Sequence, residues 1–172
     1  MELFLKSPPS IEPLTLDEVR SYLRLSSGSD DALVLSLIAA ARSHVERLTG
    51  RALLKQQWQM ELKPPYPRSS PLVQRREENI IIHLLKPPLL GIQSVQAQEK
   101  DIPYQKAGGK ILLSTHFMEE EIRITYWAGY GETPALLPAD LKMSVLMAVG
   151  CLYDRQPLHL PLLEGFKVFG VG

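Results

Sequence analysis

A strand, a tight turn and a helix follow one another without a break between residues 121 and 157. Ile122, Ile124 and Tyr126 alternate with more polar residues, and this period of two is typical of a strand that lays one face on a core. The Gly-Tyr-Gly sequence at 129–131 allows the backbone conformations of a tight turn. The stretch therefore predicts a closing strand that ends at a glycine turn.

A helix is expected from residue 138 to about residue 155. Pro138 suits the first helical turn, because the N–H that proline lacks would have had no partner there. Pro157 ends the helix. Apolar residues recur every three or four positions, which predicts one buried stripe made of Leu141, Val145, Ala148 and Leu152.

Two further helices are expected near the N-terminal end. Thr15 and Glu18 form a capping box ahead of a short helix over residues 16–25. A longer helix over residues 30–49 precedes Gly50, which is placed for a left-handed C-cap. This longer helix also has an apolar stripe and is expected to pack on the last helix; the stripe contains Val34, Ile38, Ala41, Val45 and Leu48.

Strand patterns occupy the sequence between the second and third helices. Four prolines within residues 64–71 exclude regular structure there and predict a long surface loop. The Ala-Gly-Gly sequence at 107–109 predicts the turn of a hairpin. The expected strands cover residues 54–62, 80–84, 93–98, 104–106, 110–113 and 122–127.

The order of these elements predicts an α+β fold, because strands and helices do not alternate along the chain. A small helical bundle, with helices near 16–25, 30–49 and 138–155, is expected to carry an inserted antiparallel β lobe at about residues 54–128. We therefore expect a single domain over residues 1–172, with an N-terminal arm at 1–14, the bundle at 15–50 and 138–156, the lobe at 52–130 and a C-terminal tail at 157–172.

The charge balance argues against several classes of partner. The 172 residues include 19 lysines and arginines and 19 aspartates and glutamates, so no overall field draws the chain to nucleic acid or to an anionic membrane. The single cysteine cannot form an internal disulfide, and no apolar run is long enough for a signal peptide or a membrane span. With 45% hydrophobic residues available for a core, a soluble intracellular protein is expected.

No combination of residues suggests catalysis. Cys151 lies in the apolar run of the last helix and is expected to be a packed thiol. The three adjacent glutamates at 119–121 are interpreted as a solvated loop edge. We therefore expect no enzyme, no cofactor and no metal. The four histidines lack the paired spacing of a helical metal site; they are His44, His83, His116 and His159.

Four segments in a fixed order carry a resemblance to a known family. They are LTLDEVRSYLRL at 14–25, DDALVLSLIAAARSHVERLTGRAL at 30–53, KPPLLGIQSV at 86–95 and ITYWAGYGETPALLPADLKMSVLMAVGCLYDRQP at 124–157. Together they resemble the head–tail connector (adaptor) family of tailed phages and prophages, which also occurs in gene-transfer agents. The similarity covers about residues 14–157.

The resemblance implies a structural virion protein. Members of that family form a ring, commonly of twelve subunits, under the portal, and they provide the surface on which a stopper or tail component docks while DNA passes through the hole. The expected partners are therefore other copies of the chain, the portal protein and a stopper or tail-completion protein, with no specific DNA binding and no membrane. The expected location is the head–tail junction of the virion, and the host cytoplasm during assembly.

Five apolar residues are candidates for such contacts. Aromatic residues concentrate binding energy in interfaces, and the apolar C-terminal tail is interrupted by proline and glycine. We expect this tail, residues 158–172, to lie along another chain; packing back on its own domain is the alternative. The tryptophan also has a second interpretation, as cover for the core of the β lobe. The candidates are Trp127, Tyr130, Leu162, Phe166 and Phe169.

Three other functions remain open. The first is a head-closure or tail-completion protein. The second is a small regulatory DNA-binding protein whose first two helices form a helix-turn-helix, although the second helix offers few basic residues beyond Arg42, Arg47 and Arg51. The third is an enzyme that uses Cys151 and a histidine.

Overall fold

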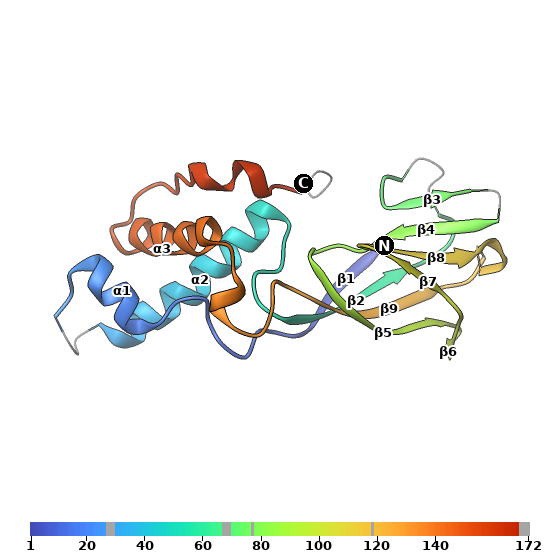
Figure 1. Cartoon of the computed structure of the whole chain (residues 1–172), viewed down its shortest axis with the longest axis horizontal. Coiled ribbons are helices and arrows are strands. Elements are labelled where there is room, and N and C mark those ends of the chain that lie inside the picture. Colours follow the sequence, from blue (N-terminus) through green and yellow to red (C-terminus); the bar gives the residue numbers. More distant parts are fainter. Residues whose placement is uncertain (27–29, 67–69, 77, 118, 169–172) are drawn as a thin grey trace. The chain divides into compact units, whose positions relative to one another are not determined.

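The computed structural model describes residues 1–26, 30–66, 70–76, 78–117 and 119–168 of the chain. The chain divides into two compact units, which Figure 1 shows with their elements labelled. The β unit consists of residues 1–8 and 55–129, and the helical unit consists of residues 9–54 and the described residues that follow 129. The α+β class and the antiparallel β lobe predicted from the sequence are confirmed.

The helical unit contains three α-helices close to the predicted ranges. These are α1 (Leu16–Leu23), α2 (Asp31–Thr49) and α3 (Ala139–Tyr153), with short 3₁₀ helices η2 (Pro134–Leu136) and η3 (Pro161–Phe166). The predicted capping box forms: the Glu18 N–H donates to Thr15 Oγ1 at 3.2 Å, and the Thr15 N–H donates to Glu18 Oε2 at 2.7 Å. Gly50 ends α2 with φ at 71°, the left-handed conformation expected of it.

The core of the helical unit lies where α2 packs on α3. The predicted stripes face each other there, and their fully buried members include Ile38 and Val45 of α2 and Leu141 and Val145 of α3. Leu152, at the C-terminal end of the α3 stripe, is only partly buried. The prediction for Leu48 is wrong: it is 42% exposed, and the buried position near this end of α2 is Thr49. The helix pairing predicted from the two apolar periods is confirmed.

The C-terminal segment packs on its own helical unit rather than lying along another chain. Leu163 of η3 is 1% exposed and belongs to the helical core, with Phe166 packed against it. Backbone bonds fix the segment further, because the Val168 N–H donates to the Thr49 carbonyl at 2.9 Å. Our expectation for this tail is therefore wrong for residues 158–168, since the helical core leaves an apolar site that Leu163 fills.

The β unit contains two antiparallel sheets. The larger has the order β1-β2-β9-β5-β6 and the smaller has the order β3-β4-β8-β7. The hairpin predicted around residues 107–109 is confirmed as the β7–β8 pair. The strands are β1 (Glu2–Ser7), β2 (Gln56–Leu62), β3 (Val73–Arg75), β4 (Asn79–His83), β5 (Leu89–Ala97), β6 (Lys100–Asp101), β7 (Gln105–Ala107), β8 (Lys110–Ser114) and β9 (Ile122–Ala128).

Residues 1–14 do not form the single N-terminal arm expected from the sequence. Residues Glu2–Ser7 form β1 and pair with β2 at the edge of the larger sheet, with Leu3 opposite Met60. Residues 9–14 belong instead to the helical unit. Because β1 has no regular alternation of apolar and polar residues, only its pairing with β2 makes it a strand. The β unit is therefore built from two separate parts of the chain.

The closing strand β9 lies between β2 and β5 in the middle of the larger sheet. Its predicted alternation is confirmed, because Ile122, Ile124 and Tyr126 are fully buried. The Tyr126 hydroxyl donates to the Leu85 carbonyl at 3.0 Å, and burial raises the pKa of this phenol far above its ordinary value. The smaller sheet also buries apolar residues, including Ile82 of β4, and Figure 1 shows this sheet alongside the larger one.

Candidate interaction surfaces

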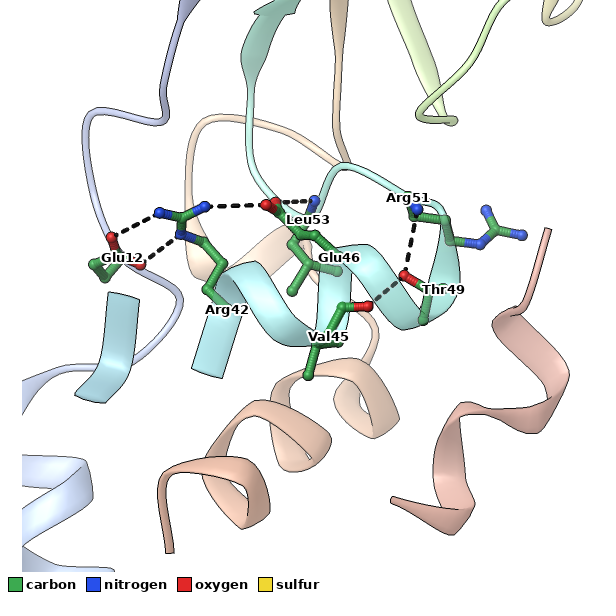
Figure 2. Close-up of polar contacts among 7 residues, drawn as sticks. All are labelled: Glu12, Arg42, Val45, Glu46, Thr49, Arg51 and Leu53. Atoms are coloured by element: carbon green, nitrogen blue, oxygen red, sulfur yellow. Dashed lines mark hydrogen bonds and ion pairs between the residues drawn. The ribbon is translucent and has the colours of Figure 1, made fainter. Parts of the chain in front are cut away.

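A charged network connects α2 to the segments that precede α1 and follow α2. Figure 2 shows Arg42 between two carboxylates: its Nε donates to Glu12 Oε2 at 2.7 Å, and its Nη1 donates to Glu46 Oε2 at 3.0 Å. The buried Glu46 also accepts the Leu53 N–H at 2.9 Å. Burial opposes the charge of Arg42, but the bonds to Glu12 and Glu46 outweigh it and raise the pKa of the guanidinium. These charges hold the fold and are not free to bind a ligand.

The end of α2 extends this network to the C-terminal segment. Thr49 Oγ1 donates to the Val45 carbonyl at 2.8 Å and accepts the Arg51 N–H at 3.3 Å (Figure 2). Arg51 Nε then donates to the Phe166 carbonyl at 2.7 Å. All three arginines considered for DNA contact are thus engaged in internal hydrogen bonds, because Arg47 Nη2 also bonds to His44 Nδ1 at 2.7 Å.

The larger sheet has one face turned away from the core, and this face is mainly polar. Arg123 Nε donates to Glu61 Oε1 at 3.2 Å across β9 and β2, and Gln57 bonds to Gln93 across strands β2 and β5 of the same sheet. Trp127 is half-buried on this face, with the Lys55 ammonium 4.9 Å from its ring centre. A half-buried Trp127 on this face is compatible with both interpretations, a contact residue and a cover for the β lobe.

The other predicted contact residues lie in the helical unit. Tyr130 and Phe166 pack against its core and are only partly exposed, whereas Leu162 has 39% of its surface exposed. Phe169 lies outside the described residues. Leu162 and Phe166 are thus brought together on η3, while Trp127 belongs to the β unit.

A groove between α1 and α3, which we call the α1/α3 groove, was missed from the sequence. It consists of two separate pockets. One, of about 670 Å³, lies between residues 14–21 and residues 139–146. The other, of about 490 Å³, lies between residues 22–24 and residues 147–156, where the Tyr22 ring packs against Gly150. Met143, 45% exposed, lines the first pocket. The sequence did contain an indication of this groove, because the apolar residues of α3 cover more than the face that packs on α2.

Polar contacts cross the edge of this groove. Lys142 Nζ of α3 bonds to Glu18 Oε1 of α1 at 2.6 Å. This bond, together with the Thr15 N–H, lowers the pKa of the Glu18 carboxyl. The contact ties the capped end of α1 to α3, and the neighbouring Asp17, whose side chain is 90% exposed, forms an ion pair with Arg20 at 3.3 Å.

Reactive side chains do not converge within the described part of the chain. No group of three or more histidine, cysteine or acidic residues that could hold a metal ion occurs there. Cys151 is partly exposed along the α1/α3 groove rather than fully packed, which corrects the expectation for this thiol. Among the described helices none is both long and apolar enough to cross a membrane.

Comparison with known proteins gives one family match and several structural matches. Residues 12–157 match the model of the head completion protein family, so the match covers parts of both units. No curated protein sequence matches the chain.

The structural matches share the fold over nearly the whole chain. One is a chain from the "Virion of native gene transfer agent (GTA) particle", with a TM-score of 0.75 and 20% identity, covering 99% of this chain and 98% of the other. Another comes from the "Neck of native GTA particle computed with C12 symmetry", with a TM-score of 0.74, 20% identity and the same coverage. At this identity the likeness establishes the shared fold.

Proposed function

Because the chain belongs to the head completion protein family, we propose that it is a structural component of the junction between the head and the tail of a phage or of a gene-transfer agent. In this role copies of the chain form a ring under the portal, and the ring offers the surface on which a stopper or tail component docks. DNA passes through the ring. The chain acts by assembly and catalyses no reaction.

The family match over residues 12–157 carries this proposal. The fold supports it, because a neck protein of the same fold was solved with C12 symmetry and both units of the present chain are covered. We therefore propose twelve subunits for the ring on the portal. A head-closure or tail-completion role at the same junction uses the same contacts with neighbouring proteins and is the closest alternative.

The charge distribution is compatible with a conduit for DNA. Each lysine or arginine that contacts a phosphate adds salt-dependent affinity, which would slow sliding. The chain has a formal net charge of +0, and the buried arginine network around Arg42 is occupied by carboxylates. We propose that DNA passes without specific binding.

We rank the candidate contact residues by how much of each side chain is exposed. Leu162 and Trp127 remain candidates because a part of each side chain is open to solvent. Tyr130 and Phe166 are candidates only through their exposed edges, since both also support the helical core. Phe169 is retained as a candidate from the sequence.

The helix-turn-helix alternative finds no support in α2. Two of its exposed positions are Leu33 and Leu35, which are 50% and 52% exposed, and its Arg42 is bound by two carboxylates. A recognition helix needs hydrogen-bonding side chains there to read base edges. We therefore do not propose DNA recognition by α1 and α2.

Mass measurement and electron microscopy test the proposed function. The purified chain is examined alone and after mixing with the portal protein of the same particle. We expect a ring of twelve copies on the portal. A chain that stays monomeric and does not bind the portal under any of these conditions would rule the proposal out.

A further inference from the structure

Each sheet of the β unit has two edge strands, and β1 is the longest of these four. An open edge pairs readily with another strand, and proteins protect edges with short strands and charged side chains. At the other edge of the larger sheet, β6 has only two residues, Lys100 and Asp101. The edge strands of the smaller sheet, β3 and β7, have three residues each. By contrast, β1 has six residues, and among the described strands it pairs only with β2.

The side chains of β1 make this edge apolar as well as open. Phe4 and Leu5 are 42% and 46% exposed. Leu3 and Leu5 lie on the face of the sheet that carries the buried Met60, and Phe4 lies on the opposite face. The pairing of β1 with β2 is regular from Glu2 to Leu5, and a bulge follows. Over this regular part, both faces of β1 offer apolar surface to a further strand.

The outer side of β5, beyond its short pairing with β6, is a less regular edge. Leu90 is as exposed there as Phe4 is on β1, at 42%. The register of β5 against β9 is irregular at two places, between Leu89 and Gly91 and again between Ile92 and Ser94. Such bulges bend and twist a strand, which protects an edge from pairing. A straight partner strand therefore fits β1 better than β5.

We propose that β1 binds β1 of a second copy of the chain, antiparallel, so that the free protein forms a two-fold dimer in which the two larger sheets are continuous. Directly opposite residues share a face of a sheet, so the two-fold axis passes between two identical residues. With Phe4 at the axis, Leu3 lies opposite Leu5 of the second copy, and Glu2 lies opposite Lys6. With Leu3 or Leu5 at the axis, Glu2 or Lys6 would lie opposite Phe4.

The charges at the two ends of β1 favour the register with Phe4 at the axis. Opposite charges stabilise a cross-strand pair, and this register contains two Glu2–Lys6 pairs. Glu2 already lies 3.6 Å from Lys63 of its own chain, but both side chains are more than half exposed, so that ion pair is weak and leaves carboxylate oxygens for Lys6. These charges add to a contact made mainly by backbone hydrogen bonds and the three apolar residues.

This dimer is distinct from the proposed ring. The two open β1 edges cover each other, so the assembly stops at two copies. A cyclic ring instead repeats one head-to-tail contact, and neighbours in it cannot meet through the same strand. The dimer therefore belongs to the free protein, before it joins the portal.

Mass measurement on the free full-length chain over a dilution series tests the dimer. We expect twice the 19.3 kDa of one chain. Phe4→Lys sets two lysines opposite each other at the axis and should raise the dissociation constant of the dimer about tenfold. Leu90→Lys is the matched control, because Leu90 is equally exposed on the same sheet, and it should leave the dissociation constant unchanged. Circular dichroism and tryptophan emission check that both variants are folded.

Disulfide formation tests the register. The variants are made together with Cys151→Ser, which removes the native thiol. Opposite Cα atoms of an antiparallel pair are about 4.5–5.5 Å apart, within the range of a disulfide, so Phe4→Cys should oxidise to a covalent dimer. Leu5→Cys is the neighbouring control: the two copies of residue 5 lie diagonally, about 7–8 Å apart, and should give little product.

The outcomes separate this contact from the proposed function. The mass of a single chain at every concentration overturns the dimer, and a dimer that Phe4→Lys weakens no more than Leu90→Lys shows that the β1 contact is wrong. A yield from Leu5→Cys equal to or above that from Phe4→Cys overturns the register and the proposal with it. The ring is measured separately on the portal, so a β1 dimer without a ring supports this inference and rejects the proposed function.

Discussion

At the scale of single residues, the stability of the helical unit depends on Arg42. This guanidinium is the common partner of Glu12 and of the buried Glu46, and Glu46 in turn holds the Leu53 N–H. We expect Arg42→Ala to lower the free energy of unfolding by about 3 kcal/mol, because the mutation removes the ion pairs with Glu12 and with the buried Glu46 together. Urea denaturation followed by circular dichroism measures this change.

A second arginine on the same helix provides the control. Arg47 is exposed and bonds only to His44 among the hydrogen bonds between described residues, so Arg47→Ala should change the free energy of unfolding by less than about 0.5 kcal/mol. If Arg42→Ala is as mild as Arg47→Ala, the network around Glu46 does not stabilise the unit.

At the scale of elements, η3 contributes only one of its two adjacent leucines to the helical core. Leu163 is 1% exposed and Leu162 is 39% exposed. We expect Leu163→Ala to cost about 3 kcal/mol of stability, since it leaves a cavity between η3 and the helices. Leu162→Ala should cost less than about 0.5 kcal/mol and should leave the helical signal unchanged.

The same pair separates folding from assembly. Leu162 is a proposed contact residue, so its alanine variant is expected to reduce binding to the portal or to a neighbouring subunit while the monomer stays folded. Equal destabilisation by the two variants, measured by urea denaturation, would contradict the assignment of Leu163 alone to the core.

At the scale of the whole molecule, two units with separate cores share one chain. Both tryptophans, Trp58 and Trp127, belong to the β unit, while all three α-helices belong to the helical unit. Tryptophan emission therefore reports unfolding of the β unit, and far-ultraviolet circular dichroism reports mainly the helical unit. We expect Leu163→Ala to move the dichroism midpoint and to leave the fluorescence midpoint in place.

Tyr126→Phe is the reciprocal variant. It removes the hydroxyl that donates to the Leu85 carbonyl inside the β unit. The free energy of unfolding measured by tryptophan fluorescence should therefore fall by about 1 kcal/mol, while the value measured by circular dichroism stays the same. If both signals move together in either variant, the two units unfold as one cooperative block.

Local patterns predicted much of this architecture. The capping box at Thr15, the glycine after α2 and the alternation in β9 each act over a few neighbouring residues, so their consequences can be read without the fold. The two apolar stripes of α2 and α3 predicted their packing for the same reason. The resemblance, carried by four segments in order, indicated the family that the match over residues 12–157 then confirmed.

Other features depended on groups that are distant in the sequence. Strand β1 exists because β2 offers it a free edge, and η3 is fixed by a core that α2 (Asp31–Thr49) and α3 (Ala139–Tyr153) build from distant parts of the chain. Among the predicted contact residues, sequence reasoning identified Leu162 as apolar but could not distinguish it from the buried Leu163, since exposure depends on what packs nearby.

The sequence by itself determined where helices and strands form and which face of each is apolar, because those properties depend on residues within a few positions of one another. Only the tertiary structure decided how the apolar faces are divided between core and surface. Burial requires a partner surface. The chain supplies one for the inner stripe of α3, which packs on α2, whereas Leu33 and Leu35 of α2 and Met143 of α3 stay exposed.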